Sequence, residues 1–156
     1  MGDFDMSRDY KLAGAILFPM ALIGFTCNVC VVVFLRSMPS LNNSFGSLTF
    51  AQALVDSAHQ LLLAGYLAPT IYFRNEAMYA VSDQFGYATL LAYQLCCFSH
   101  VSISINRFVN IYAPFVYSTL FSKSSTRKLI VVYWILGFTI MTYMFKIGKF
   151  SVKIRT

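Results

Sequence analysis

Residues 12–35 read LAGAILFPMALIGFTCNVCVVVFL, and none of these 24 residues is Asp, Glu, Lys, Arg or His. A helix of this length rises ~1.5 Å per residue and therefore crosses a hydrocarbon core of roughly 30 Å with some tilt. The run exceeds the roughly 7 to 15 apolar residues of a signal peptide, and the preceding MGDFDMSRDYK is mixed in charge. The stretch predicts a retained first helix of an integral membrane protein.

Across the chain of 156 residues, 58% are hydrophobic and 12% are charged, about half of the roughly 25% usual in a soluble domain. The net charge is +6, but Lys and Arg stand at the ends of apolar segments, so we expect no nucleic-acid partner. Cys27 and Cys30 have C-x-x-C spacing without a nearby His or second pair, and we expect no metal. The few scattered acids and the lack of a Gly-rich phosphate loop predict neither catalytic residues nor a cofactor.

Three further apolar segments follow the first. We expect membrane helices over residues 45–73, 85–106 and 129–145, the last of which is near the lower length limit for a span. Polar turns and a linker rich in Ser, Thr and Lys separate them, and residues 146–156 form a short basic tail. The predicted fold is an all-α transmembrane bundle of about four helices.

Polar residues recur every three or four positions in the second and third predicted helices. This spacing places their side chains on one face of each helix. Because an ionisable group in hydrocarbon costs about 2.5 to 3.5 kcal/mol on insertion scales, we expect these faces to meet other helices or a wet cavity. The residues are Thr49, Gln52, Asp56, His59 and Gln60, and then Tyr93, Cys97, His100, Ser104 and Arg107.

Lys and Arg residues bear on the orientation, because short cytoplasmic loops are enriched in them. The first loop and the linker after the third helix hold five, against three in the N-terminus and second loop, which favours an N-terminus outside. The four basic residues of the tail reverse this count if all four segments cross. Three interpretations stay open: an inverted topology, a fourth segment that does not fully cross, or a tail that is not the normal continuation.

The stretch NRFVNIYAPFVY, residues 106–117, resembles the end of the third helix in rhodopsin-type G-protein-coupled receptors. In that family an Asp-Arg-Tyr triplet is followed, seven residues after the arginine, by a proline and then by a tyrosine. Arg107, Pro114 and Tyr117 keep this spacing, with Asn106 and Phe108 in the flanking places.

Three more residues stand at family-like intervals in the first, second and fourth helices: Asn28, Asp56 and Trp134. More narrowly, the segments NNSFGSLTFAQALVD, SHVSISINRF and FVYSTLFS are similar to nematode serpentine chemoreceptors of class X. The likeness covers about residues 12–140. It implies that residues 1–145 form the N-terminal, four-helix portion of a seven-helix receptor domain.

The resemblance also implies roles for these residues. Arg107 and its motif would form a cytoplasmic switch that a heterotrimeric G protein contacts when the helices move apart. Asn106 stands where the family has a carboxylate, so an ionic lock on Arg107 is not available. Asn28 and Asp56 would belong to a polar network inside the bundle, and Trp134 would be structural.

We therefore expect a chemosensory G-protein-coupled receptor of the plasma membrane, or a truncated fragment of one, that senses an unidentified small molecule and can form receptor oligomers. Without helices five to seven, we expect this chain alone not to signal. The alternative is a non-signalling four-helix membrane protein that acts as an adaptor or as a regulatory partner of full-length receptors. For Arg107, the simpler alternative is a snorkelling anchor at the membrane face.

Overall fold

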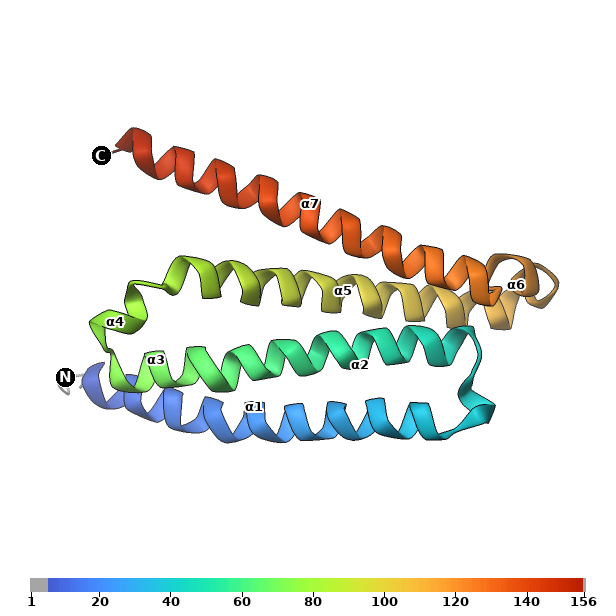
Figure 1. The fold of residues 1–156 in the computed structure, drawn as a ribbon, viewed down its shortest axis with the longest axis horizontal. Coiled ribbons are helices and arrows are strands. Elements are labelled where there is room, and N and C mark those ends of the chain that lie inside the picture. Colours follow the sequence, from blue (N-terminus) through green and yellow to red (C-terminus); the bar gives the residue numbers. More distant parts are fainter. Residues whose placement is uncertain (1–5, 156) are drawn as a thin grey trace, which may run out of the picture.

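The computed structural model describes residues 6–155, with side chains described for residues 8–147. In chain order the elements are α1 (Met6–Ser37), η1 (Pro39–Leu41), α2 (Ser44–Leu62), η2 (Leu63–Leu67), α3 (Ala68–Phe73), α4 (Glu76–Tyr79), α5 (Ser82–Tyr112), α6 (Pro114–Leu120) and α7 (Lys123–Arg155). Four long helical runs pass back and forth, so the start of α1 and the end of α7 lie at the same end of the bundle (Figure 1).

The opposite end carries η1 and α6, and we call it the basic end (Figure 1). The name reflects the Lys and Arg residues of its loops and helix termini. They are Arg36, Arg107, Lys123, Arg127 and Lys128.

α1 is longer at both ends than the predicted residues 12–35. At its start the helix includes Arg8 and Asp9, because a helix satisfies its own backbone groups whatever its side chains are. It ends at Ser37, two residues before Pro39, because a proline disfavours helical geometry in the residue that precedes it.

The predicted second helix is one continuous run of three elements, α2, η2 and α3. Asn43 caps its start, where the side-chain oxygen accepts a hydrogen bond of 2.9 Å from the Gly46 N–H. η2 is a π-helical turn, in which the Ala68 N–H donates to the Leu63 carbonyl. Pro69 follows at once and has no N–H to donate, and a widened turn is one way in which a helix accommodates this loss.

α5 differs most clearly from its predicted bounds of 85–106. The helix continues past Asn106 and ends at Tyr112, so Arg107 lies inside the helix and not at its end. Pro114 is the residue that stops α5, because the preceding Ala113 cannot easily keep helical geometry and has φ −138° and ψ 59°.

α7 also exceeds its predicted bounds of 129–145, since it begins at Lys123 and continues to Arg155. The predicted basic tail therefore prolongs the last helix, because a single Gly148 does not end a helix and no proline follows it. The side chains of residues 148–156 lie outside the described residues.

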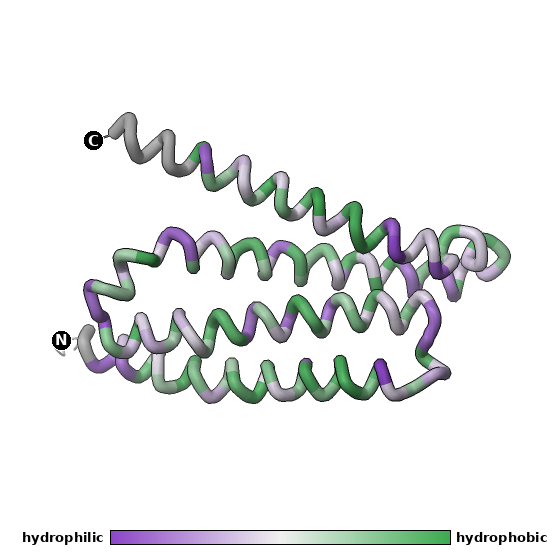
Figure 2. The backbone as a smooth tube through the Cα atoms, in the orientation of Figure 1, coloured by the Kyte–Doolittle hydropathy of each residue, from purple (hydrophilic) through white to green (hydrophobic). Residues whose placement is uncertain are grey.

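Three helices of the described part, α1, α5 and α7, are long and apolar enough to cross a membrane. The run from α2 to α3 is of similar length, and polar residues are interspersed along α2 (Figure 2). It packs along α1 on one side, and α2 packs along α5 on the other, so many of its residues meet protein. The predicted all-α membrane fold is confirmed, with four long helical runs.

α7 contacts α5 and α2, and it diverges from α5 toward its C-terminal end (Figure 1). Near that end the hydroxyls of Tyr87 and Thr142 form a hydrogen bond of 2.9 Å that still joins the two helices. Closer to the middle, a small core joins α2, α5 and α7. Its buried residues are Val55, Leu91, Leu95, Cys96 and Tyr133.

Candidate functional site

Asn106 and Arg107 are adjacent in α5 but contact different neighbours at the basic end. The Asn106 side chain is 2% exposed, and its Nδ2 donates a long hydrogen bond of 3.4 Å to Oη of Tyr117 in α6. Arg107 is exposed, and its guanidinium carbon lies 4.9 Å from the ring centroid of Phe45 at the start of α2. One residue therefore joins α5 to α6, and the next contacts α2.

α6 follows α5 after one linker residue and starts at Pro114. Proline suits the first turn of a helix, because the N–H that it lacks would have no intrahelical acceptor there. Tyr117 stacks on Phe121 with ring centroids 5.5 Å apart, and the Phe121 carbonyl accepts a hydrogen bond from the Ser44 hydroxyl of α2. α6 is thus held against both α5 and α2.

Phe108 does not take part in this packing. Its side chain is 60% exposed and stacks on Tyr112 one turn later, with ring centroids 4.7 Å apart. Of the five predicted switch residues, the structure brings Asn106 and Tyr117 together, while the side chains of the other three are exposed.

The predicted polar network of Asn28 and Asp56 is not closed within the part of the chain that the structure describes. Nδ2 of Asn28 donates to the Gly24 carbonyl of its own helix at 2.9 Å. Asp56 accepts a hydrogen bond of 3.4 Å from Gln52, one turn earlier in α2. Among the described hydrogen bonds none joins the two side chains, so a network that includes both stays a prediction.

Beside Asp56, the polar faces of α2 and α5 meet. Nε2 of Gln52 lies 3.1 Å from Nδ1 and 3.2 Å from Nε2 of His100. The Asp56 carboxylate also lies near the Cys96 thiol of α5. The three- and four-residue spacing predicted a partly buried face on α2, and the five residues named there are all half-buried. The face predicted on α5 is mostly exposed, and the spacing could not predict which side chains pair.

Trp134, for which the resemblance implies a structural role, lies in α7. Its indole packs against the core that α7 shares with α5. Its Nε1 is buried and has no hydrogen-bond partner among the described residues.

Sequence reasoning missed the residues that α5 and α6 contact on α2. Ser44 and Phe121 are 77 positions apart in the chain, and nothing local links them. Phe45 is likewise far in sequence from Arg107. The one feature of the sequence that could have indicated a cation–π contact was an aromatic residue in the first turn of a helix beside a basic loop.

The site offers hydrogen bonding, ring stacking and cation–π contact. Within the described residues, no group of three or more His, Cys, Asp and Glu side chains could hold a metal ion. Its groups are arranged to hold helices together.

The helices and this site define an α-helical membrane protein with an Asn-Arg pair near one end of its bundle. The model of the family described as "Serpentine type 7TM GPCR chemoreceptor Srx" matches residues 18–151. The chain belongs to this family, which is one of serpentine receptors and not of enzymes.

Two curated relatives agree with the family. The chain is 32% identical to "Serpentine receptor class X 45" of Caenorhabditis elegans over 143 residues, which is 89% of this chain and 40% of that protein. It is 25% identical to "Serpentine receptor class X-43" of the same organism over 141 residues, 90% of this chain and 44% of that protein. The chain therefore spans less than half the length of the curated relatives it matches.

Proposed function

We propose that this chain provides the first four helices of a chemosensory receptor that binds a small molecule and signals to a heterotrimeric G protein through its basic end. The observation that carries the proposal is the divergence of Asn106 and Arg107, one buried against α6 and the other exposed over Phe45 of α2. Asn106 can keep its contact with α6 while Arg107 loses its contact with α2.

The strengths of these contacts support this proposal. A cation–π contact at an exposed site contributes only ~0.5 to 1 kcal/mol, so the Arg107 contact with Phe45 breaks easily. Asn106 is almost fully buried, and exposing its surroundings would cost more. A displacement of α5 from α2 that carries α6 along through Tyr117 would break the hydrogen bond from the Ser44 hydroxyl to the Phe121 carbonyl. It would also release the Arg107 guanidinium for an acidic or carbonyl partner.

For the ligand, a hollow of about 350 Å³ between the α2–α3 run and the start of α5 is the candidate location. It lies at the end of the bundle opposite the basic end and is mostly apolar, with hydroxyls from Thr70, Tyr79 and Ser82. This lining suits a small, largely apolar molecule with one or two polar groups.

For the orientation, the proposal places the basic end in the cytoplasm of a plasma-membrane protein and the N-terminus outside. α7 is long enough to cross completely, which supports a fourth crossing. Engineered glycosylation tags at the N-terminus, in the second loop and after Thr156 should all be modified. Tags modified at the first two places alone would show that α7 does not cross, and a tag modified in the first loop would show the inverted topology.

The signalling role is tested in a chimaera of residues 1–145 with the remaining C-terminal part of Serpentine receptor class X 45. We expect reconstituted chimaera to accelerate GTPγS uptake by a G protein, and Arg107→Ala to abolish this while Lys128→Ala keeps it. Lys128 is an exposed cation of the same end and controls for charge. A chimaera that is correctly inserted but no faster than empty vesicles would contradict the proposal.

A further inference from the structure

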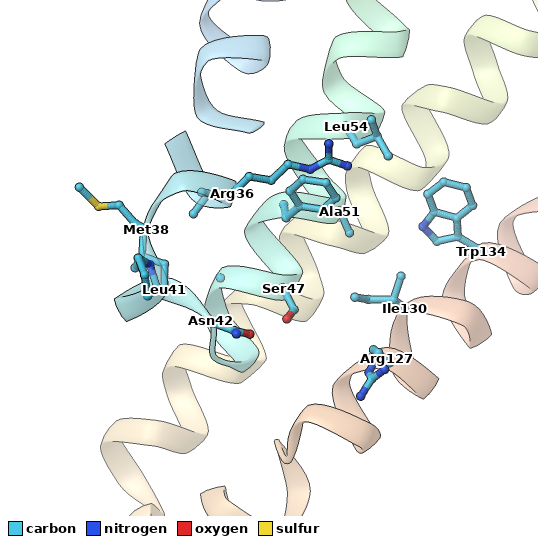
Figure 3. Close-up of a pocket in the computed structure, with 14 residues that line it drawn as sticks. Arg36, Met38, Leu41, Asn42, Ser47, Ala51, Leu54, Arg127, Ile130 and Trp134 are labelled. Atoms are coloured by element: carbon cyan, nitrogen blue, oxygen red, sulfur yellow. The ribbon is translucent and has the colours of Figure 1, made fainter. Parts of the chain in front are cut away.

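A pocket of about 670 Å³ at the basic end lies apart from the Asn106–Arg107 site, between the end of α1, the start of α2 and α7. Figure 3 shows Arg36 reaching from α1 across α2, with Arg127 on the facing wall formed by α7. The Arg36 guanidinium carbon lies 5.2 Å from the ring centroid of Phe50. The Arg127 Nε–H donates to the Lys123 carbonyl at 3.4 Å, which leaves the other guanidinium donors of Arg127 available.

The charged side chains that line this pocket are all cationic. Its lining contains two arginines and no acidic residue. Two guanidinium groups at a membrane face, without a carboxylate between them, favour an anion, and their forked donors fit a phosphate group. Asn42, in the turn before α2, and Ser47 of α2 add neutral polar groups to the pocket (Figure 3).

The rest of the pocket is apolar. Leu54, Ile130 and Trp134 line it on the side that leads into the helical bundle (Figure 3). Trp134 is seven residues after Arg127 in α7, or about 10 Å along the helix at ~1.5 Å per residue. A hydrocarbon chain that starts from a phosphate at Arg127 would therefore pass the indole within its first several carbons.

We propose that this pocket binds an anionic phospholipid, with its headgroup phosphate between Arg36 and Arg127 and one acyl chain along Ile130 and Trp134. The combination of an unpaired cationic mouth and an apolar wall fits an amphipathic anion better than a free phosphate, which would leave the apolar wall uncovered. The lipid would lie in the cytoplasmic leaflet, and only this assignment rests on the orientation proposed above.

Trp134 is the single tryptophan of the chain, so its fluorescence reports on this pocket. The full chain is reconstituted in phosphatidylcholine bilayers that contain a fraction of phosphatidylserine with bromine at carbons 6 and 7 of one acyl chain. We expect brominated phosphatidylserine to quench Trp134 with an apparent affinity about five-fold higher than that of brominated phosphatidylcholine. A five-fold difference is the order expected when one basic residue attracts an anionic lipid. Equal quenching by the two lipids would overturn the proposal.

Two variants locate the effect. Arg36→Ala and Arg127→Ala should each bring the ratio of affinities down toward one, and Arg127→Lys should keep most of it because a point charge remains. Lys128→Ala removes the same charge from the next position of α7 and should leave the ratio unchanged. A loss as large with Lys128→Ala would show a diffuse surface effect and overturn the site.

Two further outcomes decide on the occupant and on folding. Soluble glycerophosphoserine in excess should not restore the fluorescence, and restoration would mean a free-anion site instead of a lipid site. Circular dichroism checks that each variant keeps its helix content, and Arg127→Gln replaces Arg127→Ala if the alanine variant unfolds, with the same loss expected.

Discussion

The inner pair of helices, α2 and α5, differs from the outer pair, α1 and α7, in what its residues contact. α2 and α5 hold most of the buried residues of the described part. On α1, in contrast, large apolar side chains such as Met20 and Ile23 are 64% and 65% exposed. The inner pair is held by side chains that contact each other, while the outer pair has the composition of surfaces that meet lipid or further helices.

This difference follows from the bilayer as a solvent. Apolar contact between helices gains little over contact with lipid, so close backbone approach and polar pairing decide which helices stay together. The inner pair has a polar contact, because Gln52 of α2 contacts His100 of α5. Close approach occurs at the start of α2, where Gly46 lies against the Leu41 carbonyl of the preceding turn. Each variant below changes one contact of α2 or α5 and has a partner variant that leaves that contact in place.

Gly46→Ala should have the largest effect on stability. A Cβ at this position would overlap the backbone carbonyl oxygen of Leu41, so the turn that joins α1 to α2 must move. We expect a loss of about 3 kcal/mol in the free energy of unfolding, at the upper end for an inserted methyl group. Thermal unfolding in detergent micelles, followed by circular dichroism, measures it.

Gly86→Ala is the matched control for that variant. Nothing lies within 4 Å of a Cβ at Gly86 in α5, and alanine is the better helix former by about 1 kcal/mol. Gly86→Ala should therefore be neutral or stabilising. Similar losses for the two variants would show that the turn before α2 is not tightly packed.

Leu48→Ala comes next, with an expected loss of about 2 kcal/mol, because a buried leucine loses its packing and leaves a cavity. The Leu48 side chain is 1% exposed. Leu61→Ala makes the same chemical change in the same helix, at a side chain that is 55% exposed, and should lower stability far less. Equal losses in thermal unfolding would mean that the buried face of α2 is not what holds it.

The sequence was sufficient to predict the membrane class and the side of α2 that meets protein, but not the buried side of α5. Of the five residues on the polar face predicted there, four are exposed: Tyr93, His100, Ser104 and Arg107. Uninterrupted apolar length predicts a span because only length and composition matter for crossing. The regular spacing of polar residues in α2 predicted a protein-facing side, and Gln52 contacts His100 there. Both inferences use local features of the sequence, the length of an apolar run and the spacing of polar residues within one helix.

The ends of helices and the individual contacts of the site could not be predicted in the same way. The sequence predicted a helix end at Asn106, next to the charged Arg107, but α5 ends at Tyr112. An exposed arginine does not disturb helical geometry, whereas a following proline does. Phe45 and Phe121 contact the site from distant parts of the chain, and such contacts depend on the packing of whole helices. The π-helical turn before Pro69 is likewise one of several ways to accommodate a proline.

A third test addresses polar pairing across the inner helices. Gln52→Leu and His100→Leu, alone and combined, form a double-mutant cycle that isolates their mutual contact. We expect a coupling of about 0.6 kcal/mol, the average for interhelical hydrogen bonds in membranes. Ser104→Ala is the control, because the Ser104 hydroxyl donates to the His100 carbonyl of its own helix. A cycle with no coupling would show that the two side chains do not pair in the membrane.

The smallest expected effect belongs to Tyr117→Phe, which removes the hydroxyl that accepts from Asn106. The bond is 3.4 Å long, so its loss should lower the free energy of unfolding by only about 0.5 kcal/mol. The matched control is Tyr112→Phe, since Tyr112 is 74% exposed, and it should change nothing. The bond from Asn106 to Tyr117 joins α6 to α5, so its loss should let α6 open more often. Hydrogen exchange of the α6 amides is therefore the sensitive readout. Tyr117→Phe should speed this exchange while exchange in α1 stays the same. If α6 exchanges at the wild-type rate, α6 is held by Ser44 and the Phe121 carbonyl, and α5 and α6 need not move as one body.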